Sequence, residues 1–349
     1  MPREYFFALF CFQSNKVMFF ISKSIHLSAL WPTFHHFIII LFILWINNDC
    51  DCIDSNNKND GTIKTWKKNL NYEQTILFMR KLENDYPKFV RLISLGKTVK
   101  QNDIWLLRIS TEEHGQRQFN NREDLYKYYD QSRKLLRPTV KLLSTIHGDE
   151  PLGKQLLLAL AEYLLFGYNH DKDQRIIRLL NTINLEMVPI INPDGFQVAT
   201  EGDCNGIRSP RHRWNGRENA NHIDLDQNFF ITLDDNDKYS TSKHSNEPET
   251  LAIMTWIISN PSLILSASIH TGLKVIAYPF YRIHATTSDD GIFRKISQNY
   301  VDSHRNFTNG CIQSEHFKDG ISIGYEIDPD NDNNDDDGQS LHCKYGKIV

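Results

Sequence analysis

Two strand-like segments, each followed directly by a histidine, constrain the fold of this chain more than any other feature. Thr139 to Ile146 precedes His147, and the alternating segment Ser262 to Ile269 precedes His270. Pro151 then opens an apolar helical pattern, because proline suits the first position of a helix. Strand, loop and helix in this order predict an α/β sheet, which binds ligands at the carboxyl ends of its strands. We therefore expect His147 and His270 to meet at one edge of one sheet.

A carboxylate close to the first histidine suggests a metal site. His147 and Glu150 are three residues apart, a spacing that brings both side chains to one side of a tight turn or first helical turn. Together with His270 they supply two imidazoles and one carboxylate, the set that a catalytic zinc ion prefers, with a fourth position left open. We therefore expect these three residues to bind zinc. A His-x-x-Glu pattern alone is common by chance, so the surrounding sequence has to support it.

Composition limits the class of protein. The chain has 349 residues with 40% hydrophobic content, enough for one large α/β domain with flanking segments. Its formal net charge is -4, and it has no basic patch interleaved with aromatic residues. We therefore expect no nucleic-acid partner.

Short motifs in a fixed order surround the three candidate ligands. They are Tyr86-Pro87, Leu95-Gly96-Lys97, Ile104-Trp105, His147-Gly148-Asp149-Glu150, Asn192-Pro193-Asp194-Gly195-Phe196, Gly216-Arg217, Asn219-Ala220, Asp224-Leu225, Pro248-Glu249-Thr250, Trp256-Ile257, Leu265-Ser266-Ala267 and Tyr278-Pro279. In this order the chain resembles the zinc metallocarboxypeptidases, specifically the branch that contains carboxypeptidases D, E, M and N. The resemblance runs from about Trp66 to Gly324.

The resemblance implies a fold and a domain division. We expect one α/β domain over residues 66–327, with a mixed, largely parallel central sheet flanked by helices. The family pattern stops near Gly324 and an acidic stretch follows, so the last strand and helix are expected to be missing. Residues 328–349 are then an acidic, disordered tail, since like charges repel one another in a solvated chain. An alternative exon or an incorrect gene model explains this break better than an evolved terminus.

The first 65 residues form two further segments. Residues 1–48 contain the apolar run Phe37 to Ile46, which resembles the apolar region of a secretory signal and is too short to span a bilayer. Residues 49–65 form a polar linker. With the glycosylation sequon at Asn306, this pattern predicts secretion. The alternative is a retained N-terminal segment that anchors the protein to a membrane on its extracellular side.

The resemblance also assigns chemical roles. Zinc in this family polarises the scissile carbonyl and activates water. Arg217, in a Gly-Arg-x-Asn-Ala segment, matches the residue that stabilises the oxyanion of the transition state. The alternative is a surface arginine in an arginine-rich polar loop. These roles imply hydrolysis of the final peptide bond, with peptide or protein C-termini as partners. The sequence indicates no oligomeric state.

Three departures from the family pattern affect the expected activity. The Asn-Arg pair that grips the substrate carboxylate reads Asp226-Gln227 here, so a repelling carboxylate and a neutral amide take its place. Tyr281 stands where members that select basic residues have Asp. In the family, a glutamate that follows a mobile loop is the general base. No such glutamate is found here, since Glu326 aligns before that loop. We therefore expect a weak or inactive enzyme, and the alternative is a noncatalytic zinc protein that binds peptides or proteins.

Overall fold

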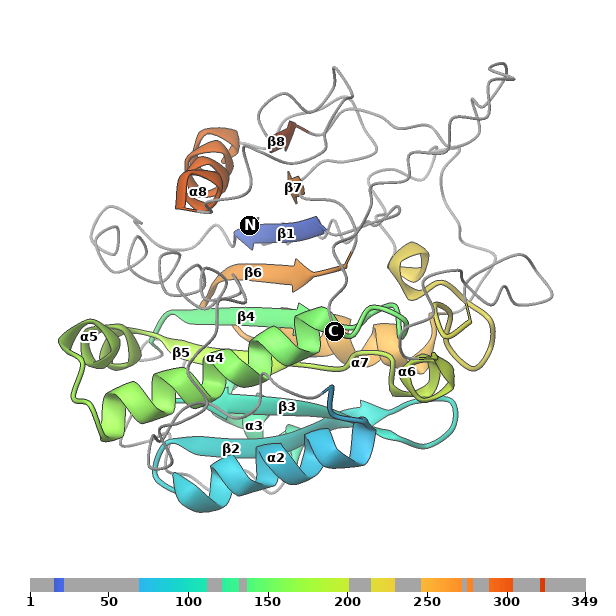
Figure 1. Cartoon of the computed structure of the whole chain (residues 1–349), viewed down its shortest axis with the longest axis horizontal. Coiled ribbons are helices and arrows are strands. Elements are labelled where there is room, and N and C mark those ends of the chain that lie inside the picture. The colour runs from blue at the N-terminus through green and yellow to red at the C-terminus, as the bar shows by residue number, and fades with distance from the viewer. Residues whose placement is uncertain are drawn as a thin grey trace, which may run out of the picture.

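A single mixed β-sheet organises the described part of the chain (Figure 1). The computed structural model describes residues 16–21, 69–111, 121–131, 137–200, 215–229, 246–271, 275–278, 289–303 and 321–323. The strands in these ranges are β1 Lys16–Ile21, β2 Val90–Lys97, β3 Asp103–Ile109, β4 Thr139–Ser144, β5 Asn184–Val188, β6 Leu263–Ile269, β7 Val275–Tyr278 and β8 Ile321–Ile323. Their order across the sheet is β2-β3-β5-β4-β6-β1-β7-β8.

Helices cover both faces of this sheet (Figure 1). The described helices are α2 Tyr72–Asp85, α3 Arg122–Gln131, α4 Leu152–Asn169, α5 Gln174–Thr182, α6 Pro193–Val198, the 3-10 helix η4 Leu225–Asn228, α7 Pro248–Ser259 and α8 Asp290–Ser303. One hydrophobic core packs α2, α4, α5 and α8 on one face of the sheet. A second core packs α3 and α7 on the opposite face. The expected mixed α/β class, with helices flanking a central sheet, is confirmed.

Local sequence signals explain where several helices begin. Asn71 and Gln74 form a capping box at the start of α2, in which each side chain accepts a hydrogen bond from the other residue's backbone N–H. Asp173 caps α5 in the same way by accepting from the N–H of Arg175. Helix α4 begins at Leu152, and Pro151 is its N-cap residue. The predicted first helical position therefore lies one residue too early, a shift within the usual uncertainty of helix ends.

The centre of the sheet is parallel and fully covered. Strand β4 pairs in parallel with β5 on one side and β6 on the other. Every residue of β4 and β5 is buried, as expected for strands with helices on both faces. At one side of the sheet, β2 and β3 form an antiparallel hairpin. The carboxyl ends of β4, β5 and β6 therefore share one edge of the sheet.

Part of the expected leader segment belongs to this sheet. Lys16–Ile21 forms β1, which pairs antiparallel with β6 and parallel with β7. The rest of residues 1–48, including the apolar run Phe37 to Ile46, lies outside the described residues, as do the linker 49–65 and the tail 328–349. The expectation of a missing last strand and helix also concerns residues that are not described. A mature chain that began after residue 48 would lack β1.

Three charged side chains are buried together under α3 and α7. Arg108 of β3 and Lys141 of β4 both pair in register with Glu186 of β5. Arg108 Nε lies 3.4 Å from the Glu186 carboxylate, and Lys141 Nζ lies 3.6 Å from it. Glu186 also accepts hydrogen bonds from Tyr129 Oη and from Trp256 Nε1, the latter at 2.8 Å. Lys141 in turn donates to the Trp256 carbonyl at 2.5 Å. This network fixes the pairing of three strands beneath two helices.

Burial of Lys141 predicts how stability depends on pH. Loss of hydration lowers the pKa of Lys141 to about 8, although Glu186 opposes the shift. An unfolded lysine has a pKa of about 10.4, so above pH 8 the unfolded chain binds more protons at this position than the folded chain does. Lys141 therefore makes the free energy of unfolding rise with pH across this window. Lys141→Met should remove that rise, measured by urea unfolding between roughly pH 7.5 and 9.5. An unchanged slope would contradict the assignment, and exposed Lys88→Met is the control.

Candidate metal centre

Both candidate histidines and Glu150 lie at the carboxyl edge of the parallel strands. Strands β4 and β6 are neighbours, and Ser144 pairs with Ile269 at their ends. His270 follows β6 directly, and His147 follows β4 after two residues. The N–H of Glu150 donates to the carbonyl of His147 at 3.1 Å, which closes the predicted tight turn. Two adjacent strand ends and one turn therefore bring the three residues together.

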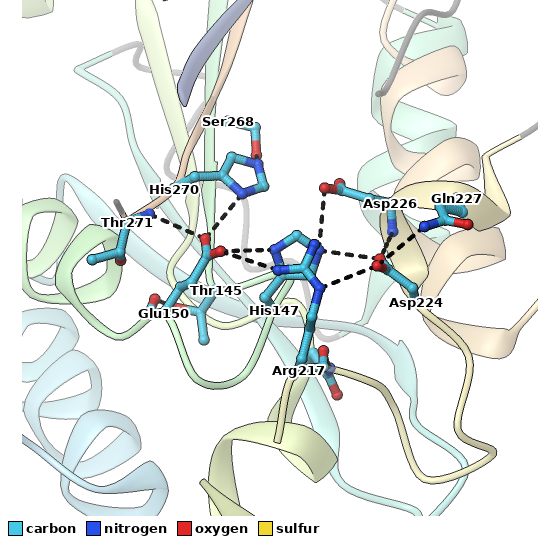
Figure 2. A network of polar contacts seen from close by, with 11 residues as sticks. Thr145, His147, Glu150, Arg217, Asp224, Asp226, Gln227, Ser268, His270 and Thr271 are labelled. Atoms are coloured by element: carbon cyan, nitrogen blue, oxygen red, sulfur yellow. Dashed lines mark hydrogen bonds and ion pairs between the residues drawn. The ribbon is translucent and has the colours of Figure 1, made fainter. Parts of the chain in front are cut away.

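The three side chains point at one another (Figure 2). His147 Nδ1 lies 3.0 Å from Glu150 Oε1, and His270 Nδ1 lies 3.0 Å from Glu150 Oε2. The two imidazole centroids are 5.3 Å apart. All three residues are buried, and one ligand atom from each lies within 4.8 Å of the others. This geometry lets one ion take all three ligand atoms.

Each imidazole has a separate partner on its other nitrogen. His147 Nε2 lies 3.1 Å from Asp224 Oδ1, and His270 Nε2 lies 3.2 Å from Ser268 Oγ. A ring that donates its proton through Nε2 keeps a lone pair on Nδ1, and such a partner also fixes the ring orientation. Two Nδ1 atoms and one carboxylate are then available as ligands. This donor set fits zinc with a fourth position for water or substrate.

The electrostatics of Glu150 suit a metal ligand. Burial raises the pKa of its carboxyl group, but the electrostatic effect of the facing His147 and His270 imidazoles outweighs that increase. The resulting pKa lies well below the ordinary value. Its Oε2 also accepts a hydrogen bond from the N–H of Thr271 at 3.1 Å. Glu150 is therefore held as a carboxylate, the form that binds metal ions.

Arg217 lies within the same cluster. Its Nη1 is 3.5 Å from Glu150 Oε1 and its Nε is 3.2 Å from Asp224 Oδ2. Only 12% of the side chain is exposed, so it is not the surface arginine of the alternative interpretation. Two carboxylates hold the guanidinium beside the candidate ligands. Its role in stabilising an oxyanion remains a prediction.

The turn from His147 to Glu150, called the ligand turn below, packs closely against the backbone of two other motifs, those that contain Phe196 and Gly216. A Cβ atom built on Gly148 would lie 2.1 Å from the backbone nitrogen of Phe196 and 2.6 Å from the carbonyl oxygen of Gly216. Gly216 has a φ of +89°, a conformation that side chains disfavour. Asn192 caps α6 and donates through its side chain to the carbonyl of Arg217 at 3.2 Å. Gly148 and Gly216 therefore permit a close backbone contact next to Arg217.

The residue that leads into the ligand turn has an unusual backbone conformation. Thr145 has a φ of 52°, and a β-branched residue rarely adopts this left-handed region. Its hydroxyl donates to the carbonyl of Glu150 at 3.2 Å, and its own carbonyl accepts from the N–H of Asn192 at 3.0 Å. Such conformations persist where surrounding contacts fix them, often at functional sites.

Asp226 and Gln227, the two positions predicted to contact the substrate terminus, also lie beside the candidate centre. The Asp226 side chain is buried, with Oδ2 3.2 Å from His147 Nε2. Gln227 donates through Nε2 to Asp224 Oδ2 at 3.4 Å. Tyr281, which is expected to mark a third altered position, and Glu326 lie outside the described residues.

Sequence reasoning gave no role to Asp224 or Ser268. Asp224 reaches His147 across 77 residues of chain, so no local spacing indicates the contact. Ser268 lies two residues before His270, on the same face of an extended strand, and this spacing is only a weak signal of a contact. Both are partners that orient a ligand, and neither is a ligand in the predicted site.

A second group of metal-ligating atoms shares one histidine with the first. His147, Asp224 and Asp226 also offer atoms within 4.8 Å of one another. Asp224 is already held by Arg217 and by the N–H of Asp226 at 3.2 Å. The first group offers two imidazoles, the ligands that suit zinc, and the second offers mainly carboxylates, which suit harder cations. We therefore assign the candidate zinc site to His147, Glu150 and His270.

Comparison with known proteins gives consistent matches over most of the chain. The family described as zinc carboxypeptidase matches residues 75–346. Carboxypeptidase D of Drosophila melanogaster is 33% identical over 257 residues, which cover 70% of this chain and 17% of that protein. Carboxypeptidase M of Mus musculus is 32% identical, covering 72% of this chain and 52% of that protein. The chain thus spans about half of the second relative and under a fifth of the first.

A solved structure supports the fold. The crystal structure of thrombin activatable fibrinolysis inhibitor superposes with a TM-score of 0.50 at 14% sequence identity. The alignment covers 75% of this chain and 60% of that one. The motif-based resemblance is therefore confirmed by independent matches, and the chain belongs to the zinc carboxypeptidase family.

Proposed function

We propose that this chain is a zinc-binding metallocarboxypeptidase that acts at peptide or protein C-termini, with turnover that is weak or absent in this form. The observation that carries the proposal is the convergence of His147, Glu150 and His270, with both imidazoles held by partners on Nε2. Bound there, zinc would supply the polarisation of the scissile carbonyl and the activation of water.

The surrounding residues would position the reacting groups. Asp224 contacts both His147 and Arg217, so one carboxylate orients a metal ligand and a cationic donor together. The Arg217 guanidinium is a charge-assisted hydrogen-bond donor, suited to an oxygen that becomes negative during hydrolysis. Burial of this cluster excludes water and strengthens each electrostatic contact.

Recognition of a free C-terminus is the weak part of the site. The buried Asp226 carboxylate would repel a substrate carboxylate, and the neutral Gln227 amide cannot form the bidentate contact of an arginine. Asp226 is the observation that favours a second candidate function. In that alternative the protein keeps its zinc and binds peptides or proteins without hydrolysing them.

Restoring the Asn-Arg pair of the family at positions 226 and 227 tests where the substrate terminus lies. Asp226→Asn with Gln227→Arg removes a repelling charge and adds a bidentate donor, so a peptide with a free C-terminus should bind about 2 to 4 kcal/mol more tightly. Calorimetric titration at saturating zinc measures this change. The same peptide with a C-terminal amide is the control, and its affinity should change far less. Equal gains for both peptides, or no gain, would show that these positions do not face the terminus.

A hydrolysis assay beside the titration separates the two candidate functions. Chelator-sensitive release of a C-terminal residue by the wild-type chain would establish the enzyme. Release by neither the wild type nor the double variant, despite tighter binding by the variant, would favour the binding protein. We expect no measurable release of C-terminal Lys or Arg, because the terminal grip and the selecting Asp are absent from the sequence.

We further propose that the protein enters the secretory pathway. The support is the apolar run Phe37 to Ile46 and the sequon at Asn306, with a retained membrane anchor as the alternative. Among the described helices, none is long and apolar enough to cross a membrane. Expression in eukaryotic cells should yield a glycosidase-sensitive product, and a form that carries no glycan would contradict export. Sequencing its N-terminus also decides whether Lys16–Ile21 remains in the chain as β1.

A further inference from the structure

Asp226 is an unusual neighbour for a metal ligand. Its side chain is 1% exposed and approaches His147 beside Asp224 (Figure 2). The distance from Asp226 Oδ2 to His147 Nε2 is 3.2 Å. Neither side-chain oxygen of Asp226 has a hydrogen-bond partner among the described residues.

The contact between Asp226 Oδ2 and His147 Nε2 is electrostatic and lacks hydrogen-bond geometry. The hydrogen bond from His147 Nε2 is directed at Asp224 Oδ1, 3.1 Å away, and Arg217 contacts Glu150 and Asp224. A buried carboxylate without hydrogen bonds is strongly destabilising unless a positive charge compensates it. A divalent ion bound on the other side of the His147 ring would provide that compensation.

We propose that Asp226 is a positioning residue of the metal centre, a second buried carboxylate that strengthens zinc binding through His147 and destabilises the zinc-free protein. The inference rests on the proposed zinc site at His147, Glu150 and His270. Two carboxylates beside Nε2 make the imidazole a better electron donor at Nδ1, as partners of metal-bound histidines do. Glu150, Asp224 and Asp226 carry three negative charges and the Arg217 guanidinium carries one positive charge. Their net charge of -2 offsets the charge of a divalent cation.

The role differs from repulsion of a substrate carboxylate. It needs no peptide, and it acts on the affinity for the ion. Asparagine at this position keeps the size of the side chain and removes its charge, so it isolates the electrostatic effect. The same substitution relieves the buried charge in the zinc-free state. The two consequences have opposite signs, which a purely structural role for Asp226 would not produce.

The test compares the full-length chain with Asp226→Asn. Competition with a chromogenic chelator measures the zinc dissociation constant, and thermal unfolding measures the stability of the zinc-free protein. We expect zinc binding to weaken about 10- to 100-fold, the range found for partners of metal ligands. The melting temperature of the zinc-free variant should rise. Asp85→Asn, which removes an exposed charge paired with Lys81 at the end of α2, should leave zinc affinity unchanged and shift the melting temperature little, because an exposed ion pair contributes little to stability.

Three outcomes would overturn the inference. Equal zinc affinity in both chains would show that the Asp226 charge does not act on the ion. A fall in both zinc affinity and zinc-free stability would show a structural role. Loss of zinc from Asp226→Asn, with zinc retained by His270→Ala, would place the ion among His147, Asp224 and Asp226. A wild type that binds no zinc would reject the metal centre itself, a result visible before any variant is compared.

Discussion

His270→Ala should abolish tight zinc binding while leaving the chain folded. The substitution removes one of three ligands and leaves one imidazole and one carboxylate, a set too small for a catalytic zinc site. His270 belongs to the proposed ligand group but not to the second group of His147, Asp224 and Asp226. We expect about one zinc per wild-type chain and an affinity loss well beyond the roughly 100-fold effect of outer partners. Elemental analysis after dialysis against a weak chelator measures the result.

The comparison with two other histidine variants makes this test specific. His147→Ala removes an atom common to both groups, so it should lose zinc wherever the ion binds. His170 is exposed at the C-cap of α4, so His170→Ala should keep zinc. Retention of zinc by His270→Ala but not by His147→Ala would move the site to the two aspartates. Retention by all three variants would remove the site assignment.

The candidate ligands were predictable because their positions follow from simple rules. Parallel neighbouring strands end at one edge, so histidines that follow β4 and β6 must lie close together. The spacing of His147 and Glu150 fixes their common side of a turn. The order of the strands and the spacing of the residues are properties of the sequence. A site that depends only on these two properties can therefore be predicted without a structure.

Contacts between distant segments could not be predicted in this way. The buried charges of Arg108, Lys141 and Glu186 come from three strands and meet only because of the register between them. Asp224 and His147 are in contact although 77 residues of chain separate them. Lys16–Ile21 pairs with β6 across more than half of the chain, where sequence analysis placed a leader. In each case the sequence does not say which distant segments lie side by side or in what register they pair.

Asp226 shows how the two kinds of information combine. The resemblance of the sequence motifs to the family pattern predicts that this position is altered, with an effect on the substrate terminus. The structure adds a contact of 3.2 Å with a metal ligand, which predicts an effect on the ion. The two effects are separable, because the first requires a peptide with a free carboxylate and the second is measured without any peptide.

Gly148→Ala should disrupt both the fold of the site and zinc binding. The added Cβ would lie 2.1 Å from the nitrogen of Phe196 and 2.2 Å from the carbonyl carbon of Gly195. These are backbone atoms of the turn that starts α6, and they cannot move aside as the end of a flexible side chain can. Overpacking against side chains costs about 1 to 3 kcal/mol, and a clash with backbone should exceed that range.

The clash also acts on the ligands, since Gly148 lies between His147 and Glu150. Relief of the contact requires the ligand turn to move away from α6, which separates Glu150 from the two imidazoles. We therefore expect a large fall in melting temperature together with loss of zinc. Gly291→Ala is the matched control, because that glycine lies in α8 with no atom within 4 Å of its added Cβ. Alanine is the better helix former, so the control should be neutral or up to about 1 kcal/mol more stable. A Gly148→Ala chain that melts with the wild type and keeps its zinc would mean that the ligand turn and α6 do not pack as the structure shows.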